Sequence, residues 1–297
     1  MNLKLKLFAS VGLIMLASGS FSCSSRDKVN FSFLNGPKEY IKIQKGSKEV
    51  EMPVGEMVTR ELKVEGQFNA ILSDNFIDVV YIQSSDPSQF KIEGKIPANI
   101  YPYVDLSVRD GKLKIGLKPD VITVSLNSKN NPVIYITAGE LTSVELTGSG
   151  DFEANGMLAL NSGNFSITST GSGDFESDNI TVGNGMISAV ITGSGDIEFG
   201  GISAGALSLS VTGSGDIDCN NVSINDCNVN STGSGDVEIS GSAKNANLSS
   251  YGSGDIDAAK FKVENGRVTA AGSGDIVCNI LNIVKHESGS GSISNRQ

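Results

Sequence analysis

The tetrapeptide Gly-Ser-Gly-Asp occurs seven times in the C-terminal half of the chain and strongly limits how the chain can fold. The seven copies begin 19 to 23 residues apart, and an eighth, broken copy begins 17 residues after the start of the last one and runs from Gly289 to Ser292. A unit of this length cannot bury an apolar face by itself, so the repeat predicts units that stack on their neighbours. The complete copies begin at Gly148, Gly171, Gly193, Gly213, Gly233, Gly252 and Gly272.

Apolar and polar residues alternate on both sides of each tetrapeptide. The residues four positions before and four positions after the first Gly are apolar in every complete copy, as in Val144 and Phe152. Alternation with period two indicates strands with one buried face. Each coil would consist of two such strands and a third short piece, as at 221–224. This pattern predicts an all-β fold, a single-domain parallel β-helix with about 20 residues per coil. The usual preference of parallel crossovers predicts a right-handed path. A β-sandwich, the alternative, would show no fixed repeat.

Each tetrapeptide is predicted to form a corner of the coil. Glycine provides a positive φ or lets stacked backbones approach closely, and a phosphate-binding loop would need a following helix that is not predicted here. The invariant Asp predicts a structural bond to backbone N–H groups of its own corner. The predicted corner residues are Gly148, Gly150, Asp151, Gly171, Gly173, Asp174, Gly193, Gly195, Asp196, Gly213, Gly215, Asp216, Gly233, Gly235, Asp236, Gly252, Gly254, Asp255, Gly272, Gly274 and Asp275.

A second set of carboxylates follows the corner Asp by two residues, and both Asp and Glu occur in it. Stacking would place these like charges ~4.8 Å apart, which costs about 1 kcal/mol per neighbouring pair even in water. We expect a solvated acidic stripe that provides solubility or a binding face for a basic partner. Calcium bridging the acidic ladders is the alternative, since its ligands are oxygens. The members of this set are Glu153, Glu176, Glu198, Asp218, Glu238 and Asp257.

The N-terminus predicts export. Lys4 and Lys6 precede an apolar run, Leu7 to Leu16, that is short for a membrane span, so residues 1–22 are predicted to be a cleaved signal peptide. Cys23 opens a polar stretch as in a lipobox and is the predicted lipidation site; the alternative is a secreted chain without a lipid. Residues 23–59 are predicted to form a tether and N-terminal cap, and residues 60–297 the β-helix. The 21 basic and 33 acidic residues from Cys23 onward disfavour nucleic acid as a partner.

Three further segments resemble a known family. Phe68–Ile71, Asp78–Gln83 and Val108–Ile115, followed by the Gly-Ser-Gly-Asp series, are similar to the motifs of the putative auto-transporter adhesin, head GIN domain family. The resemblance covers about residues 60–295. It implies a β-helix on exported, often lipid-anchored proteins of Gram-negative bacteria, on the cell surface or at the periplasmic side of the outer membrane. The family's usual Gly pair in the first coil is replaced by Asp74-Asn75, and Asn accepts the left-handed conformation.

The chain offers no set of residues for catalysis. Its only His is His286, and the three cysteines beyond Cys23, at positions 219, 227 and 278, are predicted to point inward. We therefore expect a binding scaffold or adhesin for a surface protein or glycan, with no cofactor other than the calcium considered above. The alternatives are a polysaccharide lyase or hydrolase, and a periplasm-facing structural or signalling lipoprotein. Tyr101-Pro102-Tyr103 is the aromatic cluster on which a glycan would stack.

Overall fold

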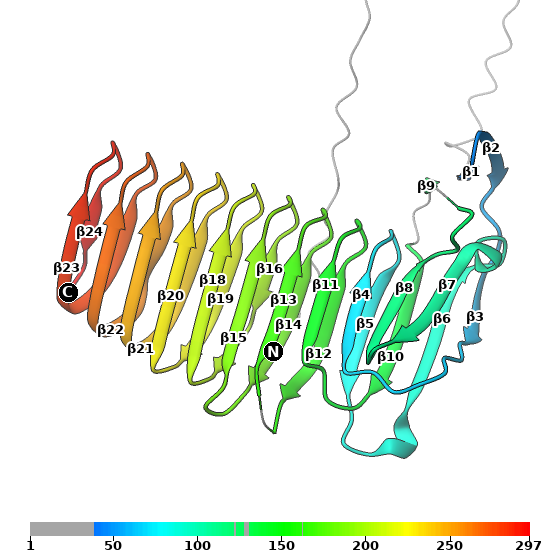
Figure 1. The fold of residues 1–297 in the computed structure, drawn as a ribbon, viewed down its shortest axis with the longest axis horizontal. Helices are drawn as coiled ribbons and strands as arrows, with labels where there is room; N and C mark the ends of the chain where they lie inside the picture. The colour runs from blue at the N-terminus through cyan, green and yellow to red at the C-terminus, as the bar shows by residue number, and fades with distance from the viewer. Residues whose placement is uncertain (1–38, 122, 128–130, 162) are drawn as a thin grey trace, which may run out of the picture. The chain divides into compact units, whose positions relative to one another are not determined.

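The structure is a computed structural model that describes residues 39–297 except 122, 128–130 and 162. Cys23 and the predicted signal peptide, residues 1–22, lie outside the described residues. The described part is all-β apart from two short 3-10 helices, and it forms a parallel β-solenoid of about 8 turns with roughly 20 residues per turn (Figure 1). The expected fold class is confirmed.

Each coil places one strand before the Gly-Ser-Gly-Asp corner and one after it. The strands before the corner are β4 (Ala70–Ser73), β11 (Ser143–Leu146), β13 (Phe165–Ser169), β15 (Met186–Ile191), β18 (Ala206–Val211) and β20 (Asp226–Ser231). Those after it are β5 (Asp78–Gln83), β12 (Phe152–Ala159), β14 (Phe175–Thr181), β16 (Ile197–Phe199) with β17 (Ile202–Ser203), and β19 (Ile217–Ser223). Near the C-terminus the two merge into β21 (Val237–Ser250), β22 (Ile256–Ala270) and β23 (Ile276–Glu287), and β24 (Ile293–Asn295) follows.

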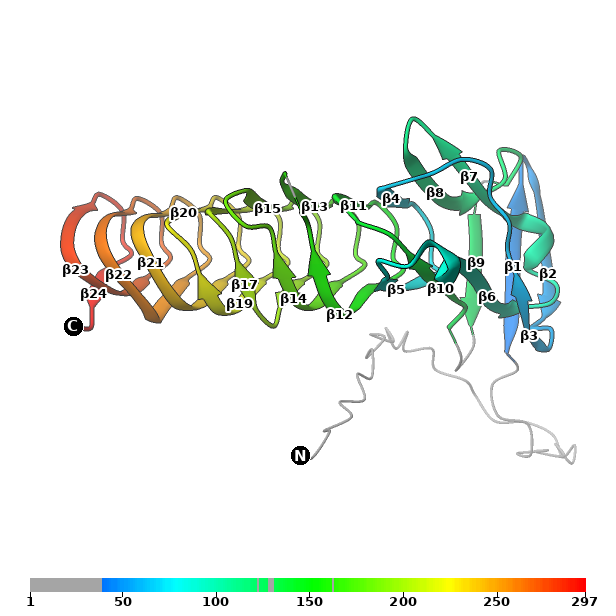
Figure 2. The ribbon, with the colours of Figure 1, turned by 90° about the horizontal axis from the view of Figure 1, so that it is seen from below.

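The strands of neighbouring coils pair in parallel and in register. Val144 lies opposite Ile167, and Phe152 lies opposite Phe175, so residues at equal distance from the corner stack on each other. The third piece of the coil is the end of β19, where the register shifts between Cys219 and Val222 and Asn221 has a φ of 50°. Figure 2 shows the resulting stack of coils along the solenoid.

The N-terminal strands depart from this plan. β1 (Tyr40–Lys45), β2 (Lys48–Pro53) and β9 (Thr123–Asn127) form a separate antiparallel sheet. β6 (Lys91–Pro97) pairs antiparallel with both β3 (Met57–Glu61) and β10 (Val133–Ala138), and β7 (Val104–Arg109) forms a hairpin with β8 (Lys112–Leu117). The sequence places the start of the β-helix at residue 60, whereas parallel stacking starts at β4, and the antiparallel strands β6–β9 interrupt it.

These strands cover the first coil. β8 pairs in parallel with β4, and β10 pairs in parallel with β5, so the edges of both strands that face the N-terminal end are occupied. The 3-10 helix η1 (Pro87–Gln89) lies in the loop between β5 and β6, and η2 (Tyr101–Tyr103) lies between β6 and β7. No helix among the described residues has the length and apolar content that a bilayer crossing requires.

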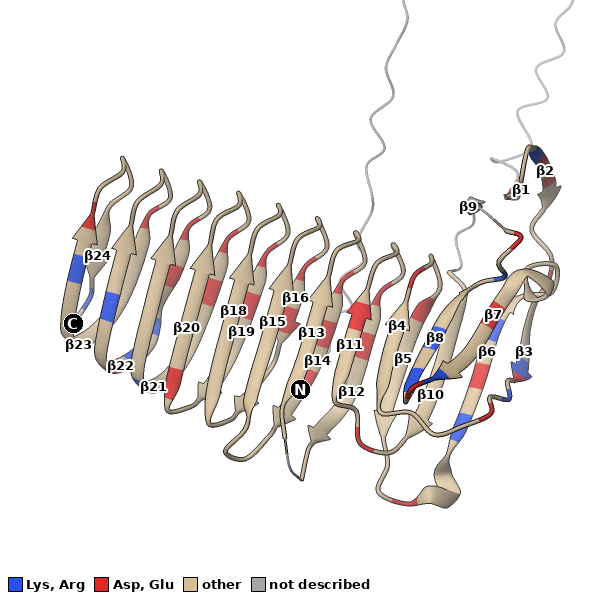
Figure 3. Ribbon diagram, viewed as in Figure 1, with Lys and Arg blue, Asp and Glu red and all other residues tan. Residues whose placement is uncertain are grey.

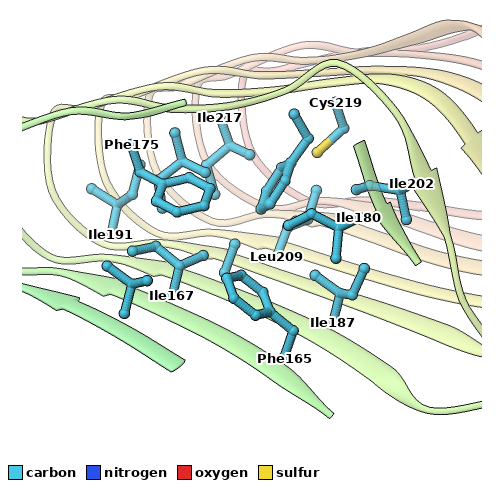
Figure 4. Packing of buried hydrophobic residues seen from close by; sticks show 14 of the residues in the cluster. Phe165, Ile167, Phe175, Ile180, Ile187, Ile191, Ile202, Leu209, Ile217 and Cys219 are labelled. Carbon is cyan, nitrogen blue, oxygen red and sulfur yellow. The ribbon is translucent and has the colours of Figure 1, made fainter. Parts of the chain in front are cut away.

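The core is a column of inward-facing side chains that runs through all the coils. Figure 4 shows a part of it, with Phe165, Phe175 and Cys219 among the labelled residues. Aromatic rings continue from coil to coil at its N-terminal end: the centroids of Phe152 and Phe175 are 5.7 Å apart with planes 12° apart, and Phe175 lies 5.7 Å from Phe199. Burial of this uninterrupted column supplies the apolar contact that no single coil makes alone.

Candidate functional site

The corner glycines are explained by close approach of stacked backbones. None of the glycines in the tetrapeptides has a positive φ. A Cβ placed on Gly193 would lie 2.0 Å from the carbonyl oxygen of Gly171, and one on Gly195 would lie 2.1 Å from that of Gly173. The same clash recurs up the stack, so both glycines are required in each coil because the preceding corner lies directly against them.

Asn75 occupies the first Gly position in the first coil. The backbone N–H of Gly150 donates to its carbonyl oxygen at 2.9 Å, as corner Gly residues do in later coils. No corner precedes Asn75, so its side chain has room: Asn75 Nδ2 donates to the Ile115 carbonyl at 2.6 Å, and Oδ1 accepts from the Ile77 N–H at 2.6 Å. Asn75 does not have a positive φ. Its presence reflects free space and not left-handed backbone.

The corner aspartates form an interlocking series that we call the aspartate ladder. Each carboxylate accepts a hydrogen bond from the backbone N–H of the Asp in the next coil: Asp196 accepts from Asp216 at 2.8 Å, and Asp216 accepts from Asp236 at 2.7 Å. The sequence predicts a bond within the residue's own corner, and the structure corrects this to a bond between coils. The ladder comprises Asp151, Asp174, Asp196, Asp216, Asp236, Asp255 and Asp275.

Different residues begin and end the ladder. Asp78 supplies the first carboxylate, which accepts from the Asp151 N–H at 3.0 Å. At the other end, Ser292 of the broken repeat donates its N–H and its hydroxyl to Asp275 Oδ1, at 2.7 and 2.9 Å. These bonds lower the pKa of Asp275, whereas burial raises the pKa of Asp151 and Asp174. Ser in place of Asp in the broken copy thus supplies a second donor to Asp275 and no carboxylate acceptor of its own.

The second set of carboxylates forms a stack that we call the acidic row: Glu153, Glu176, Glu198, Asp218, Glu238 and Asp257. Strand pairing places each member opposite the next, and Val277 follows Asp257. Within the described residues, the row has one ion pair, between Lys260 and Glu238 at 3.3 Å. Figure 3 shows acidic residues recurring along the coils, with Lys and Arg grouped on the N-terminal strands and the last coils.

Burial and neighbouring carboxylates raise the pKa of two members of the acidic row. Burial, together with the neighbouring Glu153 and Asp178, raises the pKa of Glu176. Burial, together with Glu238 and Glu198, raises the pKa of Asp218. Asp218 Oδ1 is buried, and no hydrogen-bond partner for it exists in the described part of the chain. The row therefore carries like-charge repulsion that the protein itself offsets only in part.

The two acidic series do not assemble a metal cage. Across the described residues, no group of three or more His, Cys, Asp or Glu side chains is arranged to hold a metal ion. Calcium takes six to eight oxygen ligands, and one oxygen of each ladder aspartate already accepts a backbone hydrogen bond. The described side chains thus form no ready-made calcium site, and calcium at the two acidic series stays a prediction.

The cysteines and the tyrosine cluster are parts of the fold. Cys219, Cys227 and Cys278 are free and buried, as predicted, and burial raises the pKa of all three thiols. The tyrosine cluster is not a free stacking platform: Arg60 lies 4.6 Å over the Tyr101 ring, whose hydroxyl bonds to the carbonyls of Val58 and Gly94. Lys45 lies 5.1 Å over the ring of Tyr103. His286 is exposed on the last coil.

Sequence reasoning missed an amide ladder at another edge of the solenoid. Asn245 Nδ2 donates to Asp226 Oδ1 at 2.9 Å, Asn265 Nδ2 donates to Asn245 Oδ1 at 3.5 Å, and Asn282 Nδ2 donates to Asn265 Oδ1 at 3.1 Å. These residues border an open groove of about 660 Å³. Asp226, Asn245, Asn265 and Asn282 each lie seven residues before the first Gly of the next corner, and this constant spacing is the signal that could have revealed the series in the sequence.

Comparison with known proteins gives a family and a set of similar folds. The model of the family described as "Putative auto-transporter adhesin, head GIN domain" matches residues 67–240 and 179–296. A putative adhesin from Parabacteroides merdae is 22% identical with a TM-score of 0.67, over 82% of this chain and 97% of its own. A putative adhesin from Bacteroides fragilis is 24% identical with a TM-score of 0.58, over 81% and 97%.

A third solved structure carries a different description. A putative lipid binding protein from Parabacteroides distasonis is 23% identical with a TM-score of 0.57, over 82% of this chain and 98% of its own. At these identities the likeness shows the fold alone. No curated protein matches the chain.

Proposed function

The chain belongs to the family described as putative auto-transporter adhesin, head GIN domain. From this premise we propose that it is an exported cell-envelope scaffold. It binds a basic partner through its acidic row and performs no catalysis. In this proposal Cys23, outside the described residues, carries a lipid that anchors the chain to the outer membrane. Similar proteins described as putative adhesins support a surface or exported setting.

The acidic row is the observation that supports the proposal most directly. Six carboxylates stack over five coil spacings, or ~24 Å, and within the described residues only Glu238 is paired with a cation. Each uncompensated neighbour pair costs about 1 kcal/mol at the dielectric of water, and more where water is excluded. A partner that presents Lys or Arg at matching intervals would relieve this repulsion. Relief of the repulsion would favour binding of such a basic partner over binding of a neutral surface.

The repetition also opposes the rival enzymatic function. Polysaccharide lyases and hydrolases need unlike groups that converge on one bond, such as two carboxylates with separated pKa values. The coils here repeat the same residues at the same positions, and repetition produces an extended surface. The periplasm-facing structural lipoprotein, the third candidate, would share this surface and differ in where it faces.

The test is a variant that neutralises the centre of the acidic row. Glu198→Gln, Asp218→Asn and Glu238→Gln together remove three charges while retaining side-chain size. A matched control, Glu56→Gln with Glu61→Gln and Glu65→Gln, removes three exposed charges from the N-terminal part. We expect the row variant to lose at least tenfold in affinity for a poly-lysine surface at 100 mM salt, and the control to stay within threefold. Equal losses in both would refute a specific role for the row.

Two further measurements separate the alternatives. Incubation of the full chain with acidic polysaccharides, with and without calcium, should release no oligosaccharide; release would support the enzyme. Protease treatment of intact cells should cleave the protein if it faces outward, and protection would support the periplasm-facing lipoprotein. Metabolic labelling with a fatty acid should depend on Cys23, and labelling of a Cys23→Ser variant would contradict the anchor.

A further inference from the structure

A pocket separate from the acidic row lies at the N-terminal end of the solenoid. It has a volume of about 740 Å³ and is built where the chain leaves β5, β10 and β12, at corners other than those of the tetrapeptide. Four segments far apart in the sequence supply its walls: 66–69, 83–90, 138–140 and Asn161. Its volume lies within the range of small-molecule sites in proteins, roughly 300–1,000 Å³. The loop between β5 and β6, whose path Figure 1 shows, carries η1 and supplies Ser84 to Pro87 and Phe90 to the lining.

Two phenylalanines give the pocket an aromatic wall. Phe68 and Phe90 meet edge to face, with centroids 6.2 Å apart and planes 62° apart. Phe68 is anchored by packing against the core, whereas the Phe90 side chain is 50% exposed. Phe90 lines the pocket with half of its surface open, and an aromatic ring face packs well against a flat apolar surface. The ring faces of this pair therefore suit a ligand that has a flat apolar side.

Some polar side chains around the pocket are committed to the fold. Gln83 pairs with the backbone of Ala159, donating from Nε2 to its carbonyl at 2.7 Å and accepting from its N–H at 3.0 Å. Asp86 accepts from the Ser88 N–H at 2.9 Å. Hydrogen bonding by the Ser88 side chain, and then by its N–H, holds the pKa of the Asp86 carboxyl below the usual value. These bonds fix the loop that carries Phe90, so the aromatic wall is positioned before any ligand arrives.

Other polar side chains remain available. Among the residues that the structure describes, the side chains of Gln67, Asn69, Glu140 and Asn161 make no hydrogen bond or ion pair, although all four line the pocket. Three of them are amides, which both donate and accept, and the fourth is an acceptor. A ligand with several hydroxyl groups, each of which also donates and accepts, matches this set.

The charge of the lining restricts the ligand further. No Lys or Arg lines the pocket as described, whereas Asp86 and Glu140 do. An acidic sugar would meet two carboxylates with no cation to offset them, which disfavours uronic and sialic acids. A flat apolar side, several hydroxyl groups and no negative charge are together the features of a neutral sugar.

We propose that this pocket is a binding site for a neutral oligosaccharide, whose sugar ring stacks on Phe90 while its hydroxyl groups bond to Gln67, Asn69, Glu140 and Asn161. The site is independent of the acidic row and of the basic partner proposed for it. The failure of one proposal would therefore not affect the other.

The experiment is titration calorimetry of the full chain with defined trisaccharides. The probes are the neutral trimers of glucose, mannose, galactose and N-acetylglucosamine, with the trimers of galacturonic acid and glucosamine as acidic and cationic probes. The variants are Phe90→Ala, which removes the exposed ring, and Glu140→Gln, which keeps an acceptor and removes the charge. Tyr135→Ala, which removes another exposed aromatic side chain (42%) outside the pocket, is the matched control.

We expect at least one neutral trimer to bind, Phe90→Ala to weaken it by about tenfold or more, and Tyr135→Ala to leave it within twofold. Glu140→Gln should change the affinity by less than threefold, because a neutral ligand needs the acceptor and not the charge. Binding of no neutral trimer would overturn the proposal, as would binding that Phe90→Ala leaves intact. Preferred binding of the glucosamine trimer that Glu140→Gln abolishes would assign the pocket to cations and overturn it too.

Discussion

The corner glycines allow a sharp test of how the coils are held together. In Gly215→Ala the new Cβ would lie 2.1 Å from the carbonyl oxygen and 2.8 Å from the carbonyl carbon of Gly195. Both atoms are backbone, so no side-chain rotation can relieve the contact. The two corners must separate by about 1.3 Å or more before the contact becomes ordinary van der Waals packing.

That separation disturbs the hydrogen bonds on either side of the corner. The Ser214 N–H donates to the Gly193 carbonyl at 3.0 Å, and the Asp216 N–H donates to Asp196 Oδ1 at 2.8 Å. Loss of these two bonds costs about 1 kcal/mol each. Overpacking adds about 1–3 kcal/mol. We therefore expect Gly215→Ala to lower the free energy of unfolding by about 3–5 kcal/mol.

Urea unfolding followed by circular dichroism measures the change, and hydrogen exchange of the Ser214 and Asp216 amides locates it. The matched control is Gly139→Ala, since a Cβ there meets no atom within 4 Å and the backbone φ is not positive. The control should be unchanged or more stable by up to about 1 kcal/mol. A loss below about 1 kcal/mol in Gly215→Ala would refute the explanation of the glycines by close approach.

Three other predictions concern the carboxylates and the thiols. Asp216→Ala removes the acceptor for the Asp236 N–H and should cost about 1.5–3 kcal/mol in urea unfolding, whereas Asp216→Asn, which keeps an acceptor, should cost less than half as much. Burial raises the pKa of Asp151, Asp174, Glu176 and Asp218 in the folded state, so the folded chain binds more protons than the unfolded chain above the ordinary values of 3.8 and 4.5. The four carboxyls should contribute fully to stability below those values, and this contribution should be lost as the pH rises through their raised pKa values. The double variant Glu176→Gln with Asp218→Asn should therefore flatten the plot of the urea unfolding midpoint against pH. A steeper plot would contradict this. Burial raises the pKa of Cys227 to about 12, so iodoacetamide at pH 8 should label Cys219, Cys227 and Cys278 only after denaturation, as mass spectrometry of the peptides would show.

Most of the fold could be predicted from the repeat. The alternation around each tetrapeptide predicted the inward positions, and residues such as Leu209 and Ile217 are buried in the core column as expected. Two details of the corner could not be read from it. The glycines could have served a positive φ or a close approach, and the Asp could have bonded within its own corner. Both depend on what lies in the adjacent coil, about 20 residues away, and the choice is visible only once the register is known.

The candidate sites also divide into those that the sequence predicted and those that only the structure revealed. Because the acidic row and the aspartate ladder keep a constant distance from the tetrapeptide, the sequence alone was enough to group Glu198 with Asp218 on one face. The amide ladder also keeps a constant distance from the following tetrapeptide, but its hydrogen bonds are seen only in the structure. Asp78 begins the aspartate ladder from a coil with no tetrapeptide. The pocket joins Phe68, Phe90 and Asn161 across strands that interrupt the solenoid.

The sequence by itself thus determined the stacked coils, the buried face of each strand and the two acidic series, because these follow from a periodic pattern in which every coil has the same neighbours. The tertiary structure alone decided what each corner residue touches, how β8 and β10 cover the first coil, and where Phe90 meets Phe68. Those contacts join segments that share no period, so their partners are set by the packing of the whole chain and not by local residue order.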